Sequence, residues 1–168
     1  MKQATDIIVQ LPPFVSTVAL FVDAAPEFVR NVIQKTGIDL LQFHGREKDQ
    51  ECVVYNRPFI KALRMRPEVD LKVEVNAYPN ARAILLDAYT PGIPGGTGEL
   101  FDWSRIPLEL SSQIILAGGL DATNVAQAIS QVKPYAVDVS GGVEASKGIK
   151  DAVKIQQFIT EVYRVNDY

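Results

Sequence analysis

Short apolar runs rich in β-branched residues alternate with helix-like stretches along the chain, and this alternation limits the possible folds more than any other feature. "STVALFVD" (16–23) precedes the amphipathic "APEFVRNVIQKTG" (25–37), in which Pro26 suits a helix start and Gly37 a helix end. Strands that are apolar on both faces and alternate with helices are typical of parallel sheets covered on both sides. The sequence therefore predicts an α/β fold of about six parallel strands with right-handed helical crossovers.

The other elements follow the same order. Further strands are expected at 39–45, 59–65, 81–89, 113–119 and 135–142. Helices are expected at 2–12, 46–56, 67–78, 121–131 and 148–164, with a short helical piece near 103–110. No linker-like or low-complexity segment interrupts the pattern, so residues 1–168 are predicted to form one domain.

Composition excludes several classes of function. Seventeen basic and twenty acidic residues give a net charge of -3, which argues against the clustered positive charge of a nucleic-acid-binding surface. The single cysteine, Cys52, excludes an intramolecular disulfide and a multi-cysteine zinc site. No stretch resembles a signal peptide or an apolar membrane span, so we expect a cytoplasmic protein that does not bind membranes.

Polar and glycine residues gather where the predicted strands end. In parallel α/β folds, ligands bind at the carboxyl ends of the strands. The candidate site residues are therefore Gln42, His44, Arg64, Asp87, Gly118, Gly119, Asp138, Ser140, Gly141 and Gly142.

Two glycine pairs end consecutive strands, in "IILAGGLDATN" (114–124) and "AVDVSGGVEASKGIKD" (136–151). Glycine removes side-chain bulk and permits positive φ, so a ligand can reach the backbone N–H groups. Asp121 or Thr123 can cap the next helix, and a short extra helix is expected after Ser140. The two turns together predict a phosphate site between them, although each pair could also be only a tight turn.

Asp87 ends the apolar run "AILLDAY" and is the candidate general acid. Burial at a strand tip disfavours the charged form of a carboxylic acid, which suits that role, although an aspartate there could also be a turn cap. The next loop, "YTPGIPGGTGELFDW" (89–103), is rich in glycine and proline, and such loops are often lids. Gly95, Gly96 and Thr97 are the candidate lid residues, and a disordered excursion is the alternative.

For four further candidate residues, the sequence allows either a role in ligand binding or a structural role. Asp138 could contact substrate hydroxyls or anchor its loop, and Gln42 could contact substrate or be structural. His44, the only histidine, is more often a structural group when it has no partner histidine. Arg64 could pair with a buried carboxylate or face an anionic ligand, with the structural role favoured. Cys52 falls in the middle of a predicted helix and is interpreted as a packing residue.

Six motifs in order, "LLQFHG", "FIKALR", "ILLDAY", "PGGTGELFDW", "ILAGGL" and "AVDVSGGVE", resemble the phosphoribosylanthranilate isomerase family over Leu11 to Val162. The resemblance implies a cofactor-free (β/α)8 barrel that isomerises N-(5-phosphoribosyl)anthranilate by an Amadori rearrangement in tryptophan biosynthesis. It implies Asp87 as the general acid, a phosphate site at Gly118, Gly119, Gly141 and Gly142 with Ser140 nearby, and closure of the 89–102 loop over the substrate.

The chain departs from the family at its start. The family's first strand carries a "K.CGIT"-like motif whose cysteine is the general base, and an arginine after the second strand binds the anthranilate carboxylate. Neither motif is present, Met1 falls directly before the expected second helix, and Cys52 is not at the matching place. We therefore expect an incomplete barrel that lacks the first strand, first helix and second strand.

This departure predicts weak activity, because a general base contributes roughly 10²–10⁴-fold to rate. Two alternatives to the isomerase are another phosphate-binding barrel enzyme and a non-catalytic phosphate-binding or assembly module with a decayed site. The intact "PGGTGELFDW" argues against the first, and the retained Asp87 argues against the second.

An open barrel exposes two strand edges, whereas a closed barrel exposes none. We therefore expect the chain to associate through those edges or to be poorly stable. Gel filtration and thermal unfolding test this expectation, and a monomer of high thermal stability contradicts it.

Overall fold

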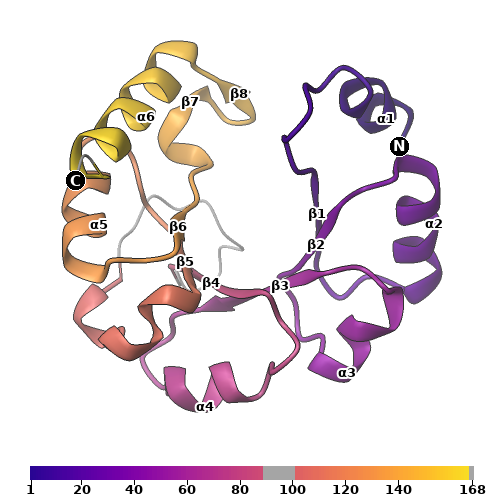
Figure 1. The fold of residues 1–168 in the computed structure, drawn as a ribbon, viewed down its shortest axis with the longest axis horizontal. Helices are drawn as coiled ribbons and strands as arrows, with labels where there is room; N and C mark the ends of the chain where they lie inside the picture. Colours follow the sequence, from indigo (N-terminus) through magenta and orange to yellow (C-terminus); the bar gives the residue numbers. More distant parts are fainter. Residues whose placement is uncertain (89–100, 167–168) are drawn as a thin grey trace. The chain divides into compact units, whose positions relative to one another are not determined.

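The computed structural model describes residues 1–88 and 101–166, without the side chain of Asn166, and the chain divides into two compact units. The first unit contains Met1–Ala62 and Val75–Ala83, and the second contains Leu63–Glu74 and Ile84–Tyr168. The predicted lid residues Gly95, Gly96 and Thr97 lie outside the described residues. Figure 1 labels the elements in chain order.

The first unit alternates helices with strands. Its elements are α1 (Lys2–Ile8), β1 (Val18–Phe21), α2 (Pro26–Thr36), β2 (Leu40–Phe43), α3 (Asp49–Cys52), the 3₁₀ turn η1 (Val53–Tyr55) and most of β3 (Phe59–Arg64). β1 pairs in parallel with β2, and β2 pairs in parallel with β3.

The second unit continues the alternation and adds a hairpin. Its elements are most of α4 (Leu71–Asn76), most of β4 (Ala83–Asp87), η2 (Trp103–Arg105), η3 (Leu108–Gln113), β5 (Ile114–Leu116), α5 (Val125–Val132), β6 (Ala136–Val137), η4 (Gly141–Val143), β7 (Glu144–Ser146), β8 (Ile149–Lys150) and α6 (Ala152–Asn166). β4, β5 and β6 pair in parallel, and β7 pairs with β8 in antiparallel. Six parallel strands alternating with helices confirm the predicted fold class.

Local sequence signals set the helix ends. α2 has Pro26 in its first turn and ends at Gly37, whose φ of 67° is left-handed. The N–H of Gly37 donates to Ile33 O at 3.0 Å and closes the helix. The expectations for this helix and for all six strands are confirmed in kind, with ends that differ by a few residues.

Several expected helices are present but differ in length or type. The helices expected at 2–12, 67–78 and 121–131 are the shorter α1, α4 and α5, and the short helical piece near 103–110 is confirmed. The helix expected at 46–56 is only one turn of α-helix followed by η1. It begins at Asp49 because Lys48 is extended (φ -82°, ψ 159°), and it ends at Tyr55 because Asn56 is left-handed with φ 51°. The piece near 103–110 consists of two 3₁₀ turns. The last helix begins at Ala152, not near 148, because β7 and β8 form a hairpin around Gly148, whose φ is 81°.

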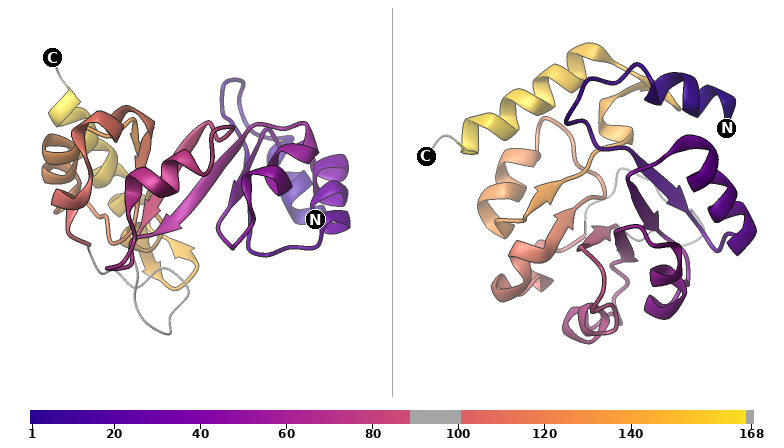
Figure 2. Two further views of the ribbon diagram at one scale, coloured as in Figure 1. Left: turned by 90° about the horizontal axis from the view of Figure 1, so that it is seen from below. Right: turned by 45° about the vertical axis from the view of Figure 1, so that its right-hand side comes forward.

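Each unit has its own core. In the first unit, Phe43 lies at the centre of an aromatic cluster, with ring centroids 6.0 Å from Phe21, 5.8 Å from Tyr55 and 6.0 Å from Phe59. In the second unit, α5 packs beside α6, as the views of Figures 1 and 2 agree, and Phe158 is buried at 6% exposure. Burial of these apolar faces, and not helix propensity, stabilises such short elements.

A buried ion pair joins the loops at the carboxyl ends of the first unit's strands. Lys61 of β3 has a side chain only 2% exposed, and its Nζ donates to Glu47 Oε2 at 3.0 Å and to Gly45 O at 2.7 Å. The Glu47 carboxylate also accepts from the N–H of Asp23 at 2.6 Å and from the N–H of Gly45 at 2.9 Å. The Lys61 ammonium also lies 5.3 Å from the Tyr78 ring centroid. One carboxylate thus ties the loops that follow β1 and β2 to β3.

We predict that Glu47→Gln destabilises the protein by about 3 kcal/mol, because it leaves the buried Lys61 ammonium without its counter-charge. Lys61→Met destabilises the protein by a similar amount, because it leaves the Glu47 carboxylate without its counter-charge. The double variant loses less free energy of unfolding than the two single variants lose together. Urea unfolding followed by circular dichroism measures all three. Lys72→Met is the control, because its 2.6 Å ion pair with Glu109 is exposed, and its unfolding midpoint stays at the wild-type value. If the losses in the free energy of unfolding caused by the two substitutions are additive in the double variant, the prediction is contradicted.

Candidate functional site

Backbone hydrogen bonds align the carboxyl ends of the strands in the second unit. The N–H of Met65, just after β3, donates to the carbonyl of Asp87 at the end of β4 at 2.9 Å. The N–H of Asp138, just after β6, donates to Leu116 O at the end of β5 at 2.8 Å. Asp87, Asp138 and the residue next to Arg64 are therefore held at one edge of the sheet in this unit.

Gly118 brings the turn after β5 directly against the end of β4. Its φ is 77°, and a Cβ at this position would collide with the backbone N of Ala88 and lie 2.8 Å from the Ala88 Cβ. Only glycine fits such a close backbone approach without a shift. The first glycine pair therefore packs against the residue that follows Asp87.

Gly142 makes the corresponding approach for the second glycine pair. A Cβ on Gly142 would collide with the carbonyl oxygen of Leu120 and lie 3.0 Å from the Asp121 Cβ. The turn after β6 is thus in contact with the turn after β5. The structure brings the two predicted phosphate turns together, and the chain of contacts continues from Gly142 through Leu120 and Gly118 to Ala88.

The backbone of these turns presents open donors. Among residues 1–88 and 101–166, no carbonyl or side-chain oxygen accepts from the N–H of Gly118, Gly119, Gly141 or Gly142. The Asn124 Nδ2 donates to Gly119 O at 2.9 Å, so the carbonyl side of the first pair is engaged while the N–H side stays open. This arrangement can accept an anion.

The turn that leads into α5 is built by Asp121. Its carboxylate accepts from the N–H of Thr123 at 2.7 Å and from the Thr123 hydroxyl at 2.6 Å. The Asp121 N–H donates in turn to Asn124 Oδ1 at 3.0 Å. The expectation that Asp121 or Thr123 caps this helix is wrong: the residue before α5 is Asn124, which makes no side-chain cap bond, and the Asp121 carboxylate instead closes the turn by accepting from Thr123.

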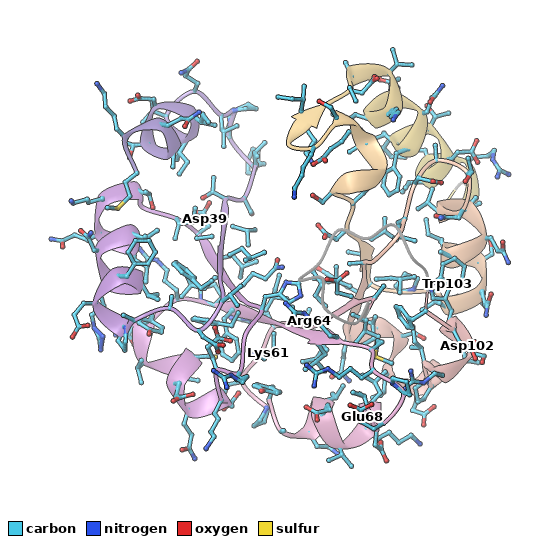
Figure 3. The ribbon with its side chains drawn as sticks, turned by 180° about the vertical axis from the view of Figure 1, so that it is seen from behind. Asp39, Lys61, Arg64, Glu68, Asp102 and Trp103 are labelled. Atoms are coloured by element: carbon cyan, nitrogen blue, oxygen red, sulfur yellow. The ribbon has the colours of Figure 1, made fainter. Side chains whose placement is uncertain are left out.

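Arg64 and Asp87 are half-buried ends of neighbouring strands in the second unit. The Arg64 Nε is buried and has no hydrogen-bond partner among the described residues. Figure 3 shows Arg64 on the same strand as Lys61. The two predicted alternatives for Arg64, a carboxylate partner or an anionic ligand, stay open, and the acid role of Asp87 stays a prediction.

Gln42 and His44 belong to the first unit. Gln42 is half-buried near the end of β2, and His44 follows that strand, with its N–H donating to Phe21 O at 2.8 Å. Both lie at the carboxyl end of β2, as the sequence predicts. Their roles toward a substrate stay predictions.

The sequence does not predict three polar residues whose hydrogen bonds hold the loops at the strand ends. Lys61 and Glu47 form the buried pair of the first unit, and Arg105 donates to the carbonyls of Arg66 at 2.8 Å and Val69 at 3.1 Å in the loop after β3. A lysine inside the apolar run "FIKALR" was the available signal, because a fully buried lysine is almost always paired. No local signal marks Glu47 or Arg105, since their partners are distant in sequence.

Cys52 is a packing residue, as predicted. It is fully buried in the core of the first unit, and this burial raises the pKa of its thiol to about 12. The described residues include no group of three or more histidine, cysteine or acidic side chains that could hold a metal ion. None of the described helices is long and apolar enough to cross a membrane.

Comparison with known proteins agrees with this geometry. A family model described as N-(5'phosphoribosyl)anthranilate (PRA) isomerase matches residues 1–161. The chain belongs to this family. An N-(5'-phosphoribosyl)anthranilate isomerase of Pseudomonas putida is 59% identical over 162 residues, which are 96% of this chain and 79% of the relative.

Solved structures of PRA isomerases show the same fold. The enzyme of Thermotoga maritima superimposes with a TM-score of 0.86 at 39% identity, over 97% of this chain and 80% of that one. A PRA isomerase in complex with reduced 1-(o-carboxyphenylamino)-1-deoxyribulose 5-phosphate gives a TM-score of 0.78 at 34% identity, over 97% and 79% of the two chains. The predicted family is therefore confirmed.

The close approach at Gly118 predicts that an added methyl group lowers the free energy of unfolding more at Gly118 than at Gly148. Gly118→Ala and Gly148→Ala both place alanine at left-handed φ, 77° and 81°, but nothing lies within 4 Å of a Cβ at Gly148. Gly148→Ala should lower the free energy of unfolding by about 1 kcal/mol. Gly118→Ala should lower it by roughly 1–3 kcal/mol more, because Ala88 must move. Urea unfolding measures both, and equal costs contradict the contact.

Proposed function

We propose that this chain acts on N-(5'-phosphoribosyl)anthranilate in the isomerase reaction of its family. The observation that carries the proposal is the contact between the two glycine turns, with Asp87 adjacent to the first of them within one unit. A sugar phosphate held at the turns through its phosphate has its ring within reach of the β4 end. The match to the Pseudomonas putida isomerase supports the same substrate.

The phosphate group of the substrate is proposed to bind the N–H groups of Gly118, Gly119, Gly141 and Gly142, with Ser140 beside them. Several N–H groups that converge on one anion bind it without a large positive charge, which suits a chain of net charge -3. The N–H of Asp138 donates to Leu116 O, and this bond holds the start of the loop after β6 beside the end of β5. No cofactor takes part in the proposed chemistry.

Asp87 is proposed to open the furanose ring. Its carboxyl group gives a proton to the ring oxygen, the bond between that oxygen and C1 breaks, and the nitrogen lone pair forms a C=N bond to C1. A general base then removes the proton from C2 to give an enolamine. The enolamine tautomerises to the ketone, with a proton delivered to C1. Arg64, at the end of β3 in the second unit, is proposed as a further candidate for a substrate contact.

The base of the second step is not Cys52. A thiol with a pKa near 12 in an apolar core is protonated at neutral pH and unreachable for substrate. No other cysteine is present in these 168 residues. We therefore propose that the chain carries the phosphate site and the acid of the reaction, and that its own turnover is low.

We further propose that both units belong to one (β/α) barrel domain, that the protein works in the cytoplasm, and that it does not bind nucleic acid or membranes. Self-association through the β1 edge is also proposed. Among the described residues β1 pairs only with β2, and Val18, Leu20 and Val22 are 45%, 55% and 51% exposed. An apolar edge of this kind favours pairing with another chain.

The test is a single-turnover isomerase assay at high protein concentration, on the 168-residue chain and on Asp87→Asn. We expect turnover roughly 10²–10⁴-fold below that of a family enzyme with a cysteine base, because the only cysteine of these 168 residues is the buried Cys52, and a further loss of roughly 10²-fold or more in Asp87→Asn. Asp39→Asn is the control, because Asp39, just before β2 begins, belongs to the first unit and its carboxylate accepts from the N–H and the hydroxyl of Thr17.

Equal activity of Asp87→Asn and Asp39→Asn removes the acid role from Asp87. Turnover of the chain at the level of a family enzyme with a cysteine base contradicts the low-activity part of the proposal.

A further inference from the structure

Lys150 forms hydrogen bonds with Ser140, the residue that precedes the second glycine pair. Lys150 ends the β7–β8 hairpin, and its Nζ donates to Ser140 O at 2.9 Å, to Ser140 Oγ at 3.3 Å and to Glu144 Oε1 at 2.8 Å. An ammonium group has three donors, and all three are engaged here. Lys150 therefore acts on the turn through Ser140 and has no donor left for a ligand.

The bond to Ser140 O fixes the direction of the next N–H group. The carbonyl of Ser140 and the N–H of Gly141 belong to one planar peptide unit, and in a trans peptide they point in opposite directions. The Ser140 carbonyl faces Lys150, and it also accepts from the Val143 N–H at 3.4 Å. The Gly141 N–H is thus aimed away from Lys150 with no acceptor among the described residues.

Glu144 holds Lys150 in place and offsets its charge. Its carboxylate accepts from Lys150 and from the N–H of Gly148 at 3.1 Å, and these hydrogen bonds hold the pKa of Glu144 below its ordinary value. Lys154 donates to the Glu144 carbonyl at 2.7 Å and does not contact Ser140. Lys150 at the end of the hairpin therefore bonds the turn, whereas Lys154 in the first turn of α6 bonds only the Glu144 carbonyl.

We propose that Lys150 is a positioning residue for phosphate binding, which orients the Ser140–Gly141 peptide so that the Gly141 N–H faces the anion. This inference rests on the proposed function, because it assigns a role within the same phosphate site. Glu144 supports it by fixing the Lys150 ammonium. The role is geometric, so it depends on the Ser140 bond more than on the positive charge.

The test is titration of the 168-residue chain with inorganic phosphate, followed by amide NMR shifts and calorimetry. Lys150→Met removes the bond to Ser140 and should weaken phosphate binding by roughly tenfold, with loss of the phosphate-induced shift of the Gly141 amide. Lys154→Met removes the same charge nearby and should leave the affinity within about twofold of wild type, since the remaining effect is screened surface electrostatics. Lys150→Arg keeps a donor and should recover part of the affinity and the Gly141 shift.

Thermal unfolding without phosphate separates positioning from stability. If Lys150→Met unfolds at the wild-type temperature but binds weakly, the proposal holds. If Lys150→Met is too unstable to titrate, Lys150→Arg and Lys154→Met still decide, because only the former should perturb the Gly141 amide. Equal weakening by the two methionine variants overturns the proposal and leaves the phosphate site intact. Absence of phosphate binding by the wild-type chain removes the proposed site itself.

Discussion

The candidate site depends on two places where one backbone packs directly against another. At Gly118 the turn after β5 touches the residue after Asp87, and at Gly142 the turn after β6 touches the carbonyl of Leu120. Neither contact leaves room for a Cβ, so the positions of the two turns are coupled through the backbone. This coupling brings an open row of N–H groups beside the end of β4. A side chain at either glycine would separate the elements whose proximity forms the candidate site.

Two lysine–glutamate pairs perform similar tasks at strand ends of the two units. Lys61 donates to Gly45 O and to Glu47, and Lys150 donates to Ser140 O and to Glu144. In each pair an ammonium group fixes a loop carbonyl while the carboxylate offsets its charge. Their environments differ, because the Lys61 side chain is 2% exposed and that of Lys150 is 45% exposed. The buried pair therefore contributes mainly to the stability of the first unit, whereas the exposed pair contributes mainly to the orientation of a loop.

Much of the fold could be predicted from the chain itself. Runs such as "FIKALR" and "AILLD" are strands because they are apolar on both faces, and α2 begins at Pro26 and ends at Gly37 because these residues fit those positions. The β7–β8 hairpin was missed, because its strands are short and polar and its turn depends on the bond from Gly148 N–H to Glu144. The helix expected at 46–56 is shorter mainly because Lys48 is extended and the helix starts only at Asp49, while the left-handed Asn56 removes its last residue.

The sequence by itself determined the fold class, the order of the strands, and the family, since periodicity, glycine pairs and long motifs are local properties. It also placed Asp87 and both glycine pairs at strand ends. Only the tertiary structure decided that Gly142 lies against Leu120, that Lys61 pairs with Glu47, and that Lys150 holds Ser140. These contacts join residues from different elements, and their geometry depends on how strands, turns and hairpin pack within each unit, which no local pattern encodes.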